Sequence, residues 1–96
     1  DRQAARKRWA PNDVLLQFFD ELADQPDKQD MRYVLALLLV RRRVMRLEEE
    51  QHDAPSGEVL VLHCPRRDAN YEVPVVMPDP ARAEVIQEEL ARLLEK

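Results

Sequence analysis

The chain has 96 residues, of which 45% are hydrophobic and 35% charged, and its formal net charge is −4. A chain of this length forms one domain with a single hydrophobic core and little spare stability. Apolar clusters recur along the whole sequence, which excludes a disordered or low-complexity chain. The single cysteine, Cys64, excludes an internal disulfide framework and favours a reducing, cytoplasmic compartment.

Nothing in the sequence predicts insertion into a membrane. No apolar run approaches the roughly 18 residues that a membrane span needs, and no signal peptide is present. The chain begins with Asp1 and not with methionine, so we expect a processed form or a fragment. Residues 1–10 hold four basic side chains and one acidic side chain, and are predicted to form a basic N-terminal arm. A single α+β domain is predicted to follow over residues 11–96.

Two helices are predicted to open the domain as a helical hairpin. Asn12 and Asp13 are typical of a helix start, and apolar residues follow at helical spacing. Residues 25–27, Gln-Pro-Asp, are predicted to end this helix. The second helix is predicted to begin between residues 27 and 30. Residues 33–40 are apolar on all sides, which indicates a central helix that is covered on most of its surface.

After the second helix the apolar period changes to two, which predicts strands. Residues 44–53 and 58–66 are predicted to pair as a β-hairpin around the turn 54–57. Gly57, the only glycine in the sequence, lies in this turn, where a positive φ is most useful.

A third strand and a last helix complete the predicted fold. Residues 71–76 form the strand, and Pro74 inside it indicates the edge of a sheet. Asp79 is the predicted cap of the last helix, with Pro80 in its first turn. The order is ααβββα: a helical hairpin, a three-stranded antiparallel β-meander and a C-terminal helix, which is an α+β fold.

Pairing around the predicted turn fixes which residues face each other in the hairpin. It sets Glu48 opposite His63, Leu47 opposite Cys64, and Arg46 opposite Pro65. One face of the sheet is then predicted to join the core through Met45, Leu47, Leu60, Leu62 and Cys64.

The second face of the sheet is also apolar, which is unusual because an antiparallel sheet normally leaves one face polar. It is predicted to hold Val59, Val61 and His63, joined by Val76. Either a helix of this chain or another chain must cover these residues. Three helices are enough to cover both faces, so we expect a helix of this chain there, with a partner protein or self-association as the alternative.

The sequence predicts no catalytic residues, no metal site and no cofactor. His63 and Cys64 are neighbours on a strand and point to opposite faces, so they cannot act as a hydrogen-bonded base and nucleophile. No CxxC or HxxxH spacing exists for zinc, and the single glycine excludes a phosphate-binding glycine loop. Cys64 is expected in the core, and His63 on the outer face beside Glu48. We therefore do not expect an enzyme.

Arginines suggest a second kind of surface, a patch that binds phosphate or nucleic acid. The patch would gather at the end of the second helix and at one end of the sheet, from Arg41, Arg42, Arg43, Arg46, Arg66 and Arg67. The sequence pI of about 5.2 and the intervening acidic segments argue against it. Pairing with the helix dipole and surface ion pairs are the commoner explanations of such arginines. Nucleic-acid binding is therefore not favoured.

Two segments resemble a known family. Residues 31–44, MRYVLALLLVRRRV, followed by an acidic strand and a hairpin, are similar to a family of small planctomycete-type bacterial proteins. Residues 12–19, NDVLLQFF, are similar to the same family, so the resemblance covers most of residues 11–94. No activity is assigned to that family, and the resemblance therefore implies no functional residue.

The sequence thus favours a non-catalytic protein-interaction or self-association module, including a homodimer. The feature behind this expectation is the doubly apolar second strand of the hairpin. The alternative is a nucleic-acid-associated regulator that uses the arginine-rich ends.

Overall fold

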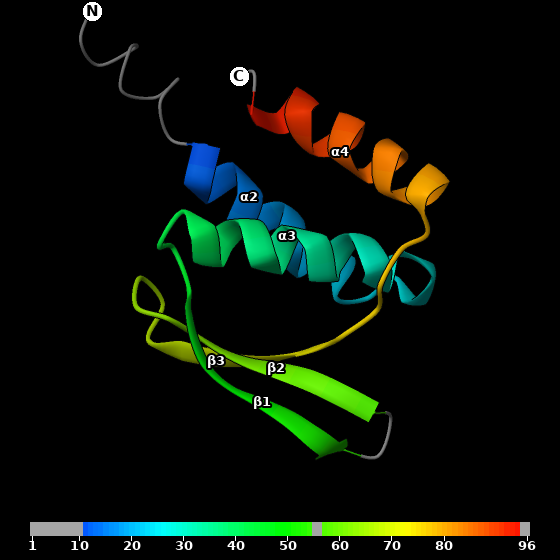
Figure 1. Ribbon diagram of the computed structural model, residues 1–96. Helices are drawn as coiled ribbons and strands as arrows, with labels where there is room; N and C mark the ends of the chain where they lie inside the picture. The colour runs from blue at the N-terminus through cyan, green and yellow to red at the C-terminus, as the bar shows by residue number, and fades with distance from the viewer. Residues whose placement is uncertain (1–10, 55–56, 95–96) are drawn as a thin grey trace, which may run out of the picture.

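The computed structural model describes residues 11–54 and 57–94. The elements follow the predicted order, and the α+β fold class is confirmed (Figure 1). They are helix α2 (Pro11–Leu22), the 3-10 turn η1 (Pro26–Lys28), helix α3 (Gln29–Arg41), strands β1 (Arg46–Ala54), β2 (Gly57–Cys64) and β3 (Ala69–Pro74), and helix α4 (Pro80–Leu94).

The α2–α3 hairpin is the middle layer of the fold. The sheet lies against one side of the hairpin, and α4 packs on α2 and α3 on the side away from the sheet (Figure 1). The expectation that the helices cover both faces of the sheet is therefore wrong, because α2, α3 and α4 all lie on one side of it. The reason is the all-round apolar surface of α3, which offers α4 a second apolar face to cover.

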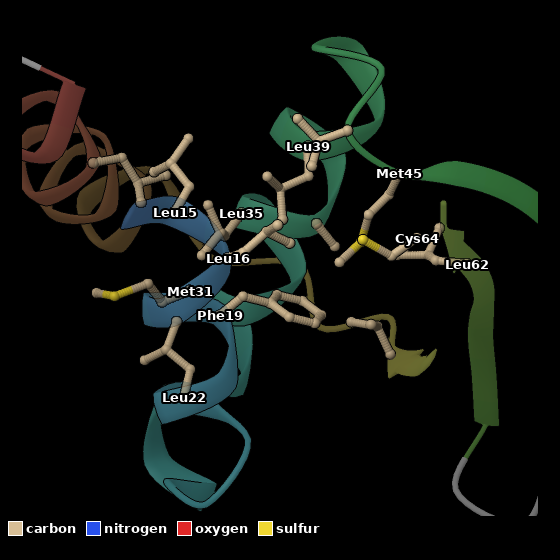
Figure 2. Close-up of a cluster of buried hydrophobic side chains, with 14 of the residues drawn as sticks. Leu15, Leu16, Phe19, Leu22, Met31, Leu35, Leu39, Met45, Leu62 and Cys64 are labelled. Atoms are coloured by element: carbon tan, nitrogen blue, oxygen red, sulfur yellow. The ribbon is translucent and has the colours of Figure 1, made fainter. Parts of the chain in front are cut away.

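Side chains of the middle layer form the core in both directions. Leu15 and Met31 point toward α4, whereas Phe19 points toward the sheet (Figure 2). Leu35 and Leu39 of α3 are fully buried between these layers. The buried hydrophobic cluster also takes residues from the connection between α3 and β1, from the strands and from α4, namely Val44, Met45, Leu60, Leu62, Cys64, Val73, Ile86 and Leu90.

The three strands pair in the order β1-β2-β3, and both pairs are antiparallel. Gly57 has φ +104°, so the predicted role of the only glycine in the hairpin turn is confirmed. Pro74 ends β3, an edge strand as predicted. Each strand begins and ends within two residues of its predicted bounds.

The predicted register of the hairpin is correct at the turn and wrong farther from it. Ala54 pairs with Gly57 as expected, but two register shifts in β1 then set Arg46 opposite His63 and Leu47 opposite Leu62. The predicted Glu48–His63, Leu47–Cys64 and Arg46–Pro65 pairs are therefore not formed. A β-bulge inserts an extra residue in one strand, which the alternation of apolar residues does not reveal.

The prediction that Leu47 belongs to the core is wrong. Leu47 pairs with the fully buried Leu62 and so lies on the helix side of the sheet, yet it is 45% exposed. β1 and β3 are the two edge strands, and α3 makes its main sheet contacts with β3, which leaves the β1 edge less covered. The other four residues predicted for the core face are buried, namely Met45, Leu60, Leu62 and Cys64.

Hydrogen bonds define the start of α4 and the end of α3. At the start of α4, Oδ1 of Asp79 accepts a hydrogen bond from the backbone N–H of Arg82 at 2.8 Å, which confirms the predicted cap. At the end of α3, the N–H of Arg43 donates to the carbonyl of Val40 and that of Val44 to the carbonyl of Leu39. This is a Schellman motif, and its left-handed residue is Arg43, with φ +63°.

The conformation of Arg43 leads to a stability prediction. A left-handed conformation strains a residue with a side chain but not glycine. We expect Arg43→Gly to raise the free energy of unfolding by about 1 kcal/mol, measured by urea denaturation. Arg42→Gly is the matched control, because Arg42 has φ −83° and glycine there should destabilise the helix end. A destabilised Arg43→Gly variant would contradict the interpretation.

Candidate interaction surfaces

No described helix covers the outer face of the sheet, the face opposite α2 and α3 (Figure 1). Cross-strand pairing places three rows of residues on it, which are Arg46–His63–Asn70, Glu49–Val61–Glu72 and Gln51–Val59–Pro74. Three of the residues predicted for a partner face, Val59, Val61 and His63, are thus its central column. Val76, the fourth, lies beyond the end of β3 in the connection to α4.

The outer face exposes less apolar surface than the sequence suggests. Val59 is only 6% exposed between its neighbours on the two edge strands, and Val61 is half-buried. Glu49 and Glu72 lie on either side of Val61. The centre of this face is therefore a short valine stripe with carboxylates beside it.

His63 and Cys64 diverge across β2 as predicted. Cys64 is fully buried in the core, whereas Nδ1 of His63 lies 2.7 Å from Oδ1 of Asn70 on the outer face. The predicted neighbour Glu48 is displaced by the register shift, and Arg46 takes its place opposite His63. Among the described residues, no group of three histidine, cysteine, aspartate or glutamate side chains could hold a metal ion.

Two arginines of the predicted anion patch join the sheet to α2. Arg66 pairs with Asp13 at 2.7 Å and Arg67 with Asp20 at 2.6 Å, both through Nη1. Nη1 of Arg67 also donates to the hydroxyl of Tyr71 at 3.2 Å. The expectation that surface ion pairs explain these arginines is confirmed for Arg66 and Arg67, and their partners Asp13 and Asp20 are seven residues apart and so share one face of α2.

Of the other four arginines of the predicted patch, two make side-chain contacts with a described residue, namely Arg42 and Arg46. Arg42 donates to Oδ1 of Asn12 at 3.0 Å, and Arg46 lies 3.5 Å from Glu48. Arg43 and Arg46 line a hollow of about 340 Å³ with Leu47, so this part of the predicted patch does come together.

The side chains of Arg41 and Arg43 make no hydrogen bond or ion pair with another described residue. The six arginines therefore do not form one continuous basic surface. Arg66 and Arg67 are held on α2 by acids, and Arg41 belongs to a different part of the molecule.

An aromatic and ionic cluster lies where α2, α3 and β3 meet. The rings of Phe19 and Tyr71 pack edge to face with centroids 5.6 Å apart, and the guanidinium of Arg32 lies 4.5 Å from the centroid of Phe19. Burial lowers the pKa of Arg32, and Asp20 and Tyr71 oppose that change. Hydrogen bonds to Tyr71 and Asp20 raise the pKa of Arg67. These contacts attach the sheet to the helical layer.

A groove between α3 and α4 is the surface that sequence reasoning missed. Its volume is about 360 Å³, and it is lined by Val34, Leu37, Leu38 and Arg41 of α3 and by Gln87, Leu90, Ala91 and Leu94 of α4. Each helix contributes positions i, i+3, i+4 and i+7, which form one stripe along its surface. Six of the eight lining residues are apolar, and Leu37 is 44% exposed.

An ion pair lies beyond one end of the groove. Nε of Arg82 lies 3.0 Å from Oδ2 of Asp30, which links the N-terminal ends of α4 and α3. The hydrogen bond from Arg82 lowers the pKa of Asp30, and the backbone N–H of Met31 adds to this effect while burial opposes it. At the other end lies Arg41, an exposed cation without a described partner.

Comparison with family models, curated proteins and solved structures finds no match. The resemblance of residues 31–44 to the planctomycete-type family stays a prediction. In the part of the chain that the structure describes, no helix is long and apolar enough to cross a membrane.

The ion pair between Asp30 and Arg82 leads to a pH prediction. Because the folded pKa of Asp30 lies below its ordinary value of 3.8, its stabilising effect is present above that value and is lost as the pH falls through the folded pKa. We expect Asp30→Asn to be less stable than wild type at about pH 7, with a difference that shrinks below about pH 4. Urea denaturation across this range measures the difference.

Asp13→Asn provides the control for this titration. Asp13 also pairs with an arginine, but its side chain is 69% exposed against 18% for Asp30. Solvent screens such an exposed pair, so we expect a smaller loss of stability. A pH-independent difference between Asp30→Asn and wild type would show that the ion pair does not stabilise the junction of α3 and α4.

Proposed function

We propose that this domain is a non-catalytic protein-interaction module that binds an amphipathic helix in the α3–α4 groove. The observation that supports the proposal is the pair of parallel stripes, each at i, i+3, i+4 and i+7, that line the groove. Helix-in-groove recognition uses anchors at this same spacing, since a helix presents such residues on one face. An incoming helix would therefore lie along the groove between the two stripes.

The exposure of Leu37 favours the groove over the outer face of the sheet. Leu37 is 44% exposed although it lies in the middle of an otherwise well-covered helix. On the outer face of the sheet, Val59 is only 6% exposed and the central valine, Val61, is half-buried. Covering the groove would thus remove more apolar surface from water per residue, and that removal is the main favourable term in association.

The charges around the groove select the chemistry of the bound helix. Arg41 at one end of the groove has no described partner, so it favours a ligand with an acidic residue near one end of its apolar stripe. Beyond the other end, Asp30 and Arg82 form an ion pair with each other and offer no net charge. The preferred ligand is an amphipathic helix whose single acidic end lies beside Arg41.

A role in nucleic-acid binding has less support. The acidic partners of Arg66 and Arg67 compete directly with phosphate for these guanidinium groups. The nucleic-acid-associated regulator remains the alternative prediction from the sequence, and no contact in the described residues favours it over the groove.

Selection from a displayed library of helical peptides tests the proposal. We expect the immobilised domain, kept at low surface density, to enrich peptides with apolar residues at i, i+3, i+4 and i+7 and an acid at one end. Leu37→Glu should weaken their binding by at least about tenfold, because it places a charge at the centre of the contact. Val85→Glu should have no such effect, since Val85 is 43% exposed but does not line the groove. Enrichment that survives Leu37→Glu, or no enrichment, would contradict the proposal.

A further inference from the structure

We infer that the groove is occupied by the same groove of a second copy, so that the chain forms a twofold-symmetric homodimer through α3 and α4. This inference rests on the proposed function, because it takes the α3–α4 groove as the binding surface and names its partner. A twofold interface joins identical patches, so the patch must complement itself when one copy is turned end to end. The distribution of charge along the two helices meets this condition.

The two helices run parallel (Figure 1), and contacts at both ends show how they are aligned. Asp30 meets Arg82 at one end, a separation of 52 residues along the chain, and Arg41 lines the groove with Leu94 at the other. Glu84 of α4, one turn before the lining residue Gln87, therefore lies level with Arg32 of α3. Arg41 lies about nine residues, or roughly 13 Å, farther along the helix direction.

A negative charge thus marks the start of the surface and a positive charge its end. Glu84 is exposed and its side chain has no hydrogen bond or ion pair with another described residue, and the same is true of Arg41. Turning a second copy end to end brings Arg41 of each copy toward Glu84 of the other. Two complementary pairs form in this arrangement, whereas a parallel arrangement would bring like charges together.

The midpoint between these two charges falls at Leu37, the most exposed large apolar residue of the groove. A twofold axis at this level places Leu37 against Leu37 of the second copy. The α3 helices then pack antiparallel, and each Arg41 reaches diagonally toward the neighbouring α4 of the other copy. Antiparallel helices that cross at about 20° are the usual geometry of four-helix bundles.

Other surfaces fit a second copy less well. Joining two outer faces around Val61 would bury the exposed carboxylate of Glu72 beside it, which costs free energy unless that carboxylate is paired. Joining two β1 edges would place the acidic run Glu48-Glu49-Glu50 near itself, a common way in which proteins prevent edge pairing. The α3–α4 surface pairs opposite charges instead.

Sedimentation equilibrium of the whole chain tests the dimer. We expect the wild type to show a dimer whose fraction rises with protein concentration, and Leu37→Glu to remain monomeric over the same range. Val85→Glu is the matched control, with nearly equal exposure but outside the groove, and should behave as wild type. A wild type that stays monomeric at every concentration would overturn the inference.

Charge reversal then tests the arrangement within the dimer. Arg41→Glu and Glu84→Arg should each weaken self-association by at least about tenfold, since each sets like charges against each other. Mixing the two variants should restore the wild-type affinity, because both cross-copy pairs become opposite again. A folding defect in either variant cannot produce this restored affinity. Arg92→Glu is the control for Arg41→Glu, and its mixture with Glu84→Arg should not reach the wild-type affinity. Two variants that dimerise like wild type, or a mixture that stays monomeric, would overturn the antiparallel arrangement.

The dimer and the proposed function can fail separately. A monomeric wild type that still binds displayed helices in a Leu37-dependent way would remove the homodimer and keep the helix-binding module. A dimer that persists in Leu37→Glu would overturn the groove as its interface. A chain that neither dimerises nor binds helices would contradict both.

Discussion

The fold depends on the burial of α3 from two sides. Its apolar residues encircle the helix, so the sheet alone cannot cover them, and α4 stacks on the opposite side of the α2–α3 hairpin. Phe19 and Leu15 show the same division within α2, because the first points toward the sheet and the second toward α4 (Figure 2). The ion pairs of Arg67 with Asp20 and of Arg82 with Asp30 then attach the sheet and α4 to this middle layer.

The position of α4 determines which surfaces remain for a partner. Because α4 covers the helical layer, the outer face of the sheet has no described helix over it, although Val59 is buried there and Val61 is half-buried. Because α4 lies parallel to α3 and not directly over it, Leu37 remains 44% exposed beside Leu90 and Ala91. Exposed apolar surface therefore appears in the groove between α3 and α4 at Leu37 and at the edge of the sheet at Leu47.

The sequence was sufficient for the order of elements, because each element carries its own signal. Gly57 marks the hairpin turn, Asp79 and Pro80 mark the start of α4, and Pro74 marks an edge strand. It was not sufficient for the register of β1, since a bulge adds a residue without disturbing the apolar pattern. Nor could it assign the side of the hairpin that α4 covers, because that choice depends on competition between two apolar surfaces. The groove was missed for that reason, although the stripe of Gln87, Ala91 and Leu94 was visible in the sequence.

Isotope-filtered nuclear Overhauser spectroscopy tests most directly where the chain associates with itself. A mixture of ¹³C-labelled and unlabelled protein reports only contacts between copies. We expect signals between the Leu37 methyl groups of the two copies, which would lie at the twofold axis, and none from Val59 or Val61. Intermolecular signals from these valines with none from Leu37 would contradict the α3–α4 interface and return the association to the outer face of the sheet.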